Sequence, residues 1–218
     1  MIIHNLRITY GAWYGAWRFP LIFALITAMP AFSDPLSGKG LLAALRAGGN
    51  VILMRHASSP RQAPDSTIAE PDNPQLERQL DESGRVSAQD MGKALRHLRI
   101  PVGRVLSSPT YRALETIRLA QLGVPITFPE LGDSGNSMTA DATGTRGAWL
   151  RAKAATPPTS GTNTVIVTHY PNIIEAYPQE AAGLADGEAL ILRPDQRGGA
   201  QLIARLKIGE WSSLDTDH

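Results

Sequence analysis

The chain has 218 residues, enough for one domain with a sizeable core, and its composition is that of an ordinary globular protein. Acidic and basic residues nearly balance at a formal net charge of +1, so the chain offers neither a basic tract for nucleic acid nor an acidic disordered arm. It contains no cysteine, which excludes disulfides, thiol catalysis and cysteine-ligated metal or iron–sulfur sites.

The N-terminal segment is typical of a secretory signal peptide. Two arginines precede the apolar run "FPLIFALITAMPAFSDP". Its core, Leu21–Ala28, is shorter than the roughly 20 apolar residues that cross a bilayer, and small residues follow it up to Ser33. We therefore predict a signal peptide over residues 1–33, cleaved after Ser33, and a periplasmic or secreted domain over residues 34–218 without stable membrane insertion. A retained hydrophobic anchor or first helix is the alternative.

The first part of the expected domain contains a helix, a strand and a long loop. "GLLAALR" predicts a short helix, Gly40–Arg46, which the following glycines end. "NVILMRH" is apolar without alternation, as expected for a strand covered on both faces. Residues 57–79 are rich in Pro, Asp and Ser, and loops of that length are commonly functional. We expect residues 60–79 of this loop to close over the leaving group of a substrate.

The stretch "LDESGRVSAQDMGKALRHLRI" gives the clearest helical pattern. Ser83 or Gly84 is expected to open the helix. Its expected apolar face consists of Val86, Met91, Leu95 and Leu98.

The remaining segments alternate strands with helices. A strand is expected in "VGRVLSSPT", a helix that stops at Gly123 in "TYRALETIRLAQLG", and a short strand in "PITFPEL". After a loop at 132–146, a helix is expected in "RGAWLRAKAAT", a strand in "GTNTVIVTHYPN" and a broken helix in "IIEAYPQEAAG". Two final strands, "GEALILRPD" and "AQLIARLKI", are expected to pair through a turn. This alternation predicts an α/β protein with a largely parallel sheet.

Three of the expected strands end in polar residues: Arg55 and His56, Ser107 and Ser108, and His169. Ligands of open α/β sheets bind in the crevice outside the carboxyl ends of the strands. We therefore expect these three distant segments to converge on one site.

The motifs "LMRHASSP", "LDESGRVSAQDMGKAL", "VLSSPTYRALET" and "VIVTHYPNI" resemble, in order and spacing, those of the histidine phosphatase superfamily. The resemblance covers residues 50 to about 210 and is closest to small bacterial members, many of them exported. It implies a phosphoglycerate-mutase-like fold, a three-layer sandwich with a mostly parallel central sheet. Ala57 and Tyr170 stand where many members have glycine.

The resemblance assigns roles to four residues. It implies that His56 is the nucleophile, that Arg55 and Arg112 bind phosphate, and that His169 is the second histidine of a metal-independent phosphohistidine mechanism that needs no cofactor. The chemistry agrees, because guanidinium groups suit phosphate oxygens and nearby cations lower the pKa of an imidazole. A backbone carbonyl near Ser58 or Ser59 is expected to hold the other ring nitrogen of His56. His169 is expected to donate a hydrogen bond to the phosphoryl oxygens.

Two further positions are open to more than one interpretation. The leaving alkoxide needs a proton, and in the superfamily the acid commonly follows a short strand in a Leu-x-Glu or Leu-x-Asp pattern, which points to Asp133, with Glu130 as the runner-up. Asn172 is a candidate substrate-binding residue, or else a cap of the following helix.

The sequence therefore predicts a histidine phosphatase that hydrolyses phosphate monoesters outside the cytoplasm. A small phosphorylated substrate is expected, and export favours an envelope sugar phosphate; no nucleic-acid partner is expected, and the oligomeric state is open. One alternative is a phosphoglycerate-type mutase. Another is a non-catalytic phosphoryl-binding protein on the same fold.

Overall fold

The computed structural model describes residues 35–60, 77–132, 145–195 and 197–216. These residues belong to a compact unit that begins at Asp34. The helices are α1 (Gly38–Ala47), α2 (Glu82–His97), α3 (Tyr111–Ala120), α4 (Thr145–Ala154) and α5 (Tyr170–Ala176), with the 3-10 helices η2 (Pro129–Leu131) and η4 (Trp211–Ser213). The strands are β1 (Val51–Arg55), β2 (Val102–Ser107), β3 (Ile126–Thr127), β4 (Asn163–Thr168), β5 (Ala189–Pro194) and β6 (Ala200–Leu206). The predicted signal peptide lies outside the described residues.

The strands form one six-stranded sheet in the order β3-β2-β4-β1-β5-β6. The first four strands of that order pair in parallel, whereas β5 is antiparallel to β1 and β6 is antiparallel to β5. The mostly parallel sheet expected from the sequence is therefore confirmed, as is the pairing of the last two strands.

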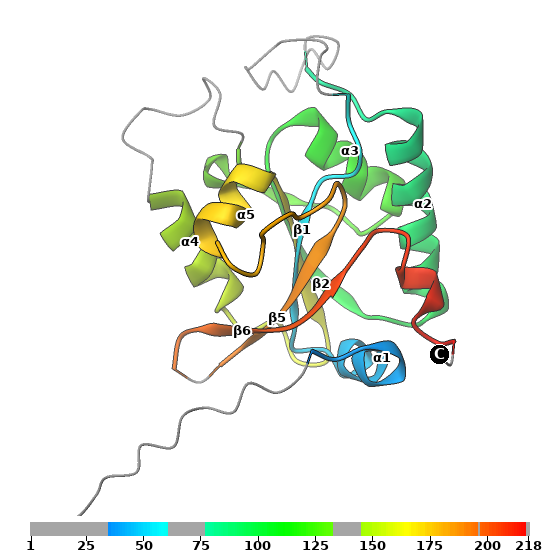
Figure 1. Cartoon of the computed structure of the whole chain (residues 1–218), viewed down its shortest axis with the longest axis vertical. Helices are drawn as coiled ribbons and strands as arrows, with labels where there is room; N and C mark the ends of the chain where they lie inside the picture. Colours follow the sequence, from blue (N-terminus) through cyan, green and yellow to red (C-terminus); the bar gives the residue numbers. More distant parts are fainter. Residues whose placement is uncertain (1–34, 61–76, 133–144, 196, 217–218) are drawn as a thin grey trace, which may run out of the picture. The chain divides into compact units, whose positions relative to one another are not determined.

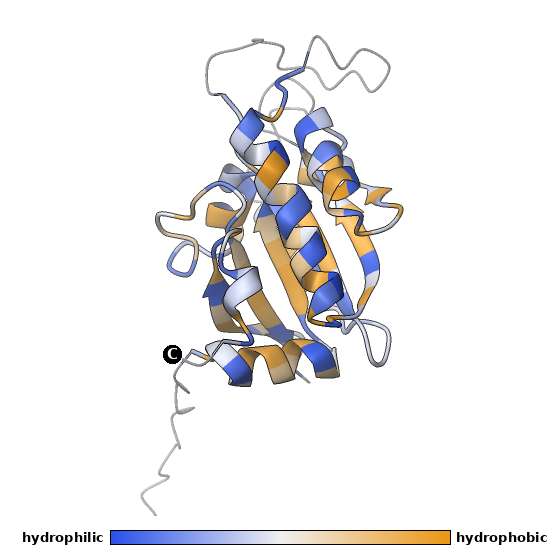
Figure 2. Ribbon diagram, turned by 90° about the vertical axis from the view of Figure 1, so that its right-hand side faces the viewer, coloured by the Kyte–Doolittle hydropathy of each residue, from blue (hydrophilic) through white to orange (hydrophobic). Residues whose placement is uncertain are grey.

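Helices cover both faces of the sheet and complete three layers (Figure 1). Alternate residues of β1 point to opposite faces: Ile52 and Met54 pack with the apolar residues of α1, α2 and α3, whereas Leu53 packs with those of α4 and α5. Figure 2 shows the same arrangement, with apolar strands behind helices whose outward faces are largely hydrophilic. The central strands are therefore covered on both sides, which explains their continuous apolar runs.

Helix α2 differs from the expectation at its start and on its apolar face. Asp81, not Ser83 or Gly84, is the N-cap, and its carboxylate accepts a hydrogen bond from the Gly84 amide at 2.7 Å. Val86 is 47% exposed, so its assignment to the apolar face was wrong. Gly84 lies on the buried face of the helix. A side chain does not fit there, because a Cβ would lie 2.1 Å from the Ser58 carbonyl oxygen. The loop after β1 therefore packs directly on the first turn of α2.

Two helix boundaries near the site also differ from the expectation. Helix α3 ends at Ala120, and Gln121 adopts a left-handed conformation with φ of 55°, so the helix stops before Gly123. Helix α5 begins at Tyr170, directly after His169, rather than within the later segment "IIEAYPQEAAG". No helix among the described residues is long and apolar enough to cross a membrane.

Candidate active site

The polar ends of β1, β2 and β4 meet at one edge of the sheet, because these strands are neighbours. Arg55 pairs with Thr168, so His56 and His169 directly follow paired residues of adjacent parallel strands. The His56 amide continues this ladder by donating to the Thr168 carbonyl at 3.0 Å. On the other side of β4, the Ser108 amide donates to the Val167 carbonyl at 2.9 Å. The predicted convergence of the three segments is therefore present.

The imidazole of His56 is held through both ring nitrogens. Arg112 donates from Nε to His56 Nε2 at 3.2 Å, and a guanidinium group can only donate, so Nε2 carries the lone pair. Nδ1 therefore carries the hydrogen and donates to the Ala57 carbonyl at 2.8 Å. A backbone carbonyl does fix the tautomer, but it belongs to Ala57 rather than to Ser58 or Ser59. The lone pair of Nε2, which accepts from Arg112 here, is the one that a nucleophile needs.

The same guanidinium group reaches the second histidine. Arg112 Nη2 donates to His169 Nδ1 at 3.2 Å, which leaves the hydrogen of His169 on Nε2. Nε2 lies 2.9 Å from the Ser108 hydroxyl oxygen and 3.3 Å from that of Thr110. Ser108 thus accepts from His169, and this tautomer makes His169 an acceptor that orients Arg112. The expected donation from His169 to a phosphoryl oxygen would require the other tautomer.

The two imidazoles lie close together, with ring centroids 5.2 Å apart and planes inclined by 63°, and both are about 2% exposed. Burial lowers the pKa of His56 well below 6.5, and the neighbouring His169 and Arg112 lower it further. Burial likewise lowers the pKa of His169, with contributions from Arg112, Arg78 and Arg55. Both rings are therefore neutral near pH 7, in agreement with the hydrogen bonds that fix their tautomers.

Helix α3 fixes Arg112 relative to the loop that follows β1. The Ala57 amide donates to the Thr116 hydroxyl oxygen at 3.1 Å, and that hydroxyl donates to the Arg112 carbonyl at 2.8 Å. Glu77 caps the same helix, because its carboxylate accepts from the Tyr111 amide at 2.5 Å. Arg112 is only 4% exposed and lies in the first turn, where the helix dipole favours an anion. The position of the Arg112 side chain is therefore set before any ligand binds.

Arg55 lies in the wall of a pocket in front of the two imidazoles. Its Nη2 is 2.5 Å from the Asp186 carboxylate, and its Nη1 donates to the Leu184 carbonyl at 3.3 Å. The guanidinium group also lies over the Tyr170 ring, 5.8 Å from its centroid. These contacts leave the buried Nε of Arg55 without a hydrogen-bond partner among the described residues.

Arg78 is a pocket residue that the sequence analysis did not identify. It lines the same pocket, lowers the pKa of His169, and has a buried Nε without a hydrogen-bond partner among the described residues. Two residues that follow it are tied to the loop after β1: Ser59 donates its hydroxyl to the Gln79 carbonyl at 2.7 Å, and Ser58 donates to the Asp81 carboxylate at 2.6 Å. The only available signal was the position of Arg78 just before the cap of α2.

The pocket has a volume of about 790 Å³. Its lining includes Arg55, His56, Arg78 and His169, together with residues 170–171 and 183–186. Buried N–H groups without partners are rare in folded proteins and commonly mark the place of an ion or water. The two unpartnered guanidinium nitrogens beside neutral imidazoles therefore suit an anion with several oxygens, such as a phosphoryl group.

Glu130 and Asn172 do not line this pocket. Asp133 lies outside the described residues. Glu130 lies in η2, does not line the pocket, and has a buried Oε2 without a hydrogen-bond partner within the described part of the chain. Asn172 is fully buried, and its amide group donates to the Gly132 carbonyl at 2.8 Å and to the Thr168 hydroxyl oxygen at 2.9 Å. Both of its hydrogens are thus used inside the protein, which suits support of the site rather than ligand contact.

Asn172 does not cap helix α5 either, because His169 occupies the N-cap position. Within the described ranges, no group of three His, Asp or Glu side chains is arranged to hold a metal ion.

Comparison with known proteins confirms the resemblance seen in the sequence. Residues 51–131 match the model of the histidine phosphatase superfamily (branch 1), which includes β1, α2, β2 and α3 and therefore His56 and Arg112. This match and the fold both support the resemblance to the histidine phosphatase superfamily. Members of this superfamily are phosphatases or mutases. No curated protein matches the chain.

Two solved structures are similar to this chain over most of its length. One is the protein histidine phosphatase SixA in complex with tungstate, with 18% sequence identity, a TM-score of 0.53, and coverage of 74% of this chain and 98% of the other. The second is a protein from Escherichia coli str. K-12 substr. MG1655 assigned as an alpha-ribazole-5′-P phosphatase, with 16% identity, a TM-score of 0.52, and coverage of 74% and 98%. At such identities the likeness establishes the fold.

Proposed function

We propose that this protein is a metal-independent phosphomonoester hydrolase that works through a phosphohistidine on His56 and acts outside the cytoplasm. One observation carries the proposal: a single buried guanidinium group, that of Arg112, contacts both imidazoles at 3.2 Å. The side chains that directly follow β1 and β4 are thereby assembled with one from α3, and His56 Nε2 is unprotonated. A surface ion-binding site would not need that arrangement, but a nucleophile does.

The first step transfers the phosphoryl group to His56. The lone pair of Nε2 attacks phosphorus while the bond from phosphorus to the ester oxygen breaks. The N–H groups of Arg112 turn from the imidazoles to the phosphoryl oxygens, and the unpartnered Nε groups of Arg55 and Arg78 supply further donors. The Nδ1–H bond to the Ala57 carbonyl stabilises the positive charge that develops on the ring.

Two proton transfers complete the cycle. Asp133, assigned from the sequence pattern, gives its proton to the leaving alkoxide, and its carboxylate then removes a proton from the attacking water. Water attacks the phosphorus of the phosphohistidine, the P–N bond breaks, and inorganic phosphate leaves. His56 returns to its neutral form with the lone pair on Nε2. To replace Asp133 in this role, Glu130 would have to bring its carboxylate, whose Oε2 is buried in η2, to the pocket that it does not line.

The location of the substrate follows from the predicted signal peptide alone. The cationic flank, the short apolar core and the small residues before Asp34 support export. An exported enzyme meets the phosphorylated sugars of the cell envelope, which makes an envelope sugar phosphate the proposed substrate.

The test is a screen of phosphate monoesters with the purified protein, in which released phosphate is measured. We expect hydrolysis by the wild type, including p-nitrophenyl phosphate, and no turnover by His56→Asn, whose side chain cannot form the intermediate. Arg118→Ala, which removes a guanidinium group exposed on the same helix as Arg112, is the control with wild-type activity. Interconversion of phosphoglycerate isomers without release of phosphate would favour a mutase. Full activity of His56→Asn would refute the nucleophile.

A further inference from the structure

Residues 183–186 line the pocket, and the loop 183–188 to which they belong is hydrogen-bonded directly to the segment that carries His56. The Gly187 amide donates to the His56 carbonyl at 2.9 Å. The Arg55 amide donates to the Glu188 carbonyl at 3.1 Å. The positions of this wall and of His56 are therefore coupled through the backbone.

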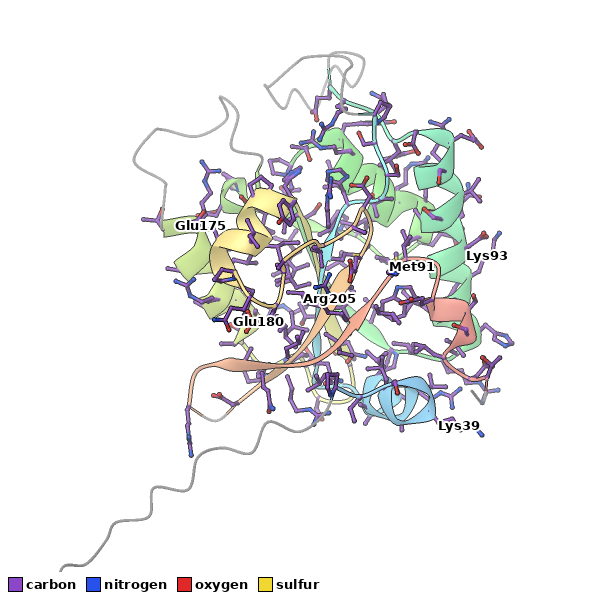
Figure 3. The ribbon with its side chains drawn as sticks, in the orientation of Figure 1. Lys39, Met91, Lys93, Glu175, Glu180 and Arg205 are labelled. Atoms are coloured by element: carbon purple, nitrogen blue, oxygen red, sulfur yellow. The ribbon has the colours of Figure 1, made fainter. Side chains whose placement is uncertain are left out.

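Side-chain contacts make the same loop rigid. One carboxylate oxygen of Glu188 accepts from the Ala185 amide at 2.8 Å, and the other pairs with Arg205 at 2.8 Å. Arg205, labelled in Figure 3, also donates to the Ala182 carbonyl at 2.9 Å. Gly187 has φ of 70°, and a Cβ there would lie 2.7 Å from Ile208 Cδ1, so only glycine fits. The loop is thus held in one conformation before substrate binds.

Asp186 presents a carboxylate from this rigid loop to the pocket. It is paired with Arg55 at 2.5 Å, and 31% of its side-chain surface remains exposed. The pair offsets the charge of Arg55. The other pocket cation, Arg78, is close enough to His169 to lower its pKa. Residues 183–186 thus contribute an acceptor of hydrogen bonds and no cation to the pocket wall.

We propose that Asp186 is a specificity-determining residue that selects phosphate monoesters of hydroxyl-bearing alcohols, such as polyols and sugars, over esters whose leaving group carries a carboxylate or a second phosphate. The proposal rests on the phosphohydrolase function proposed above. A hydroxyl group of the leaving alcohol donates a hydrogen bond to the Asp186 carboxylate, and such bonds to charged groups are the stronger ones. An anionic group at the same place meets like charge and loses that donor.

A matched pair of substrates tests this selection. sn-Glycerol 3-phosphate and 3-phosphoglycerate share a three-carbon frame and differ in a hydroxymethyl group against a carboxylate. We expect the wild type to prefer the glycerol ester by about 10-fold or more in kcat/KM. Asp186→Asn and Asp186→Ala should both reduce that ratio by about 10-fold. Asp90→Asn, which removes a carboxylate paired with Lys93 on the exposed side of α2, should leave the ratio unchanged.

p-Nitrophenyl phosphate separates specificity from the support that Asp186 gives to Arg55, because its leaving group has no hydroxyl group. A fall in kcat/KM common to all three substrates measures the disturbance of Arg55. The ratio of kcat/KM for sn-glycerol 3-phosphate to that for 3-phosphoglycerate measures selection. An unchanged ratio in both variants, or a wild type that prefers 3-phosphoglycerate, overturns this proposal while p-nitrophenyl phosphate hydrolysis upholds the phosphatase. A folded wild type that hydrolyses none of the three substrates refutes the proposed function itself.

Discussion

Arg112 offers the sharpest test of how the site is assembled. Replacing it with alanine removes the two N–H groups that contact His56 Nε2 and His169 Nδ1. In the phosphoryl complex these groups become charge-assisted hydrogen bonds, each worth about 1.5–3 kcal/mol. Loss of the pair therefore corresponds to about 3–6 kcal/mol, or about a 10²- to 10⁴-fold fall in kcat/KM. Arg112→Lys should recover only part of this, because one ammonium group cannot bridge both rings as a planar fork does.

The assay is steady-state hydrolysis of p-nitrophenyl phosphate, with inhibition by vanadate as a second readout of phosphoryl-group binding. Arg118→Ala is the matched control, because Arg118 lies on the same helix but is 68% exposed and pairs with Glu115 at the surface. Circular dichroism and thermal unfolding establish that each variant is folded. A folded Arg112→Ala protein whose activity and vanadate inhibition stay within about threefold of the wild type would show that this guanidinium does not hold the phosphoryl group.

Three further predictions concern the histidines and the acid. Ser108→Ala removes the hydroxyl that accepts from His169 Nε2–H, so kcat should fall about 10-fold with little change in KM. An unchanged kcat would mean that Ser108 does not set the tautomer of His169. The pKa values of both buried histidines are lowered, so as pH falls below 6.5 these histidines gain protons in the unfolded chain before they do in the folded protein. The free energy of unfolding, measured in urea, should therefore decrease by up to about 1.4 kcal/mol per pH unit for each ring. Constant stability from pH 7.5 to 5.5 would contradict this. Asp133→Asn should slow alkyl phosphates far more than p-nitrophenyl phosphate, and equal slowing would point to another acid.

The sequence predicted the sheet and the convergence of its strand ends, because these depend on local patterns. Continuous apolar runs mark covered strands, and parallel strands bring their carboxyl ends to one edge. The positions of His56 and His169 follow from that alone, since both come directly after paired residues. The apolar face of α2 was predicted less accurately, because Val86 fits an apolar stripe by its spacing but is exposed in the folded protein.

The rest of the site depends on contacts between loops, which no local pattern encodes. Arg78 reaches the pocket because its neighbours bond to the loop after β1, and Asp186 because Glu188 and Arg205 fix its loop. Asn172 was a candidate for ligand contact by its distance from His169 in the sequence, yet its amide is used on Gly132 and Thr168. Residue type and spacing therefore pointed to the proposed nucleophile, whereas its surroundings required the tertiary structure.

The most direct test of the account is to identify the covalent intermediate. The protein is mixed with a radiolabelled phosphate monoester, quenched within milliseconds and digested, and the labelled peptide is mapped. We expect phosphate on His56, bound to Nε2, in an amount that rises and decays at rates that account for turnover. An enzyme that releases phosphate at its full rate without labelling His56, or that labels another residue with matching kinetics, would contradict the account.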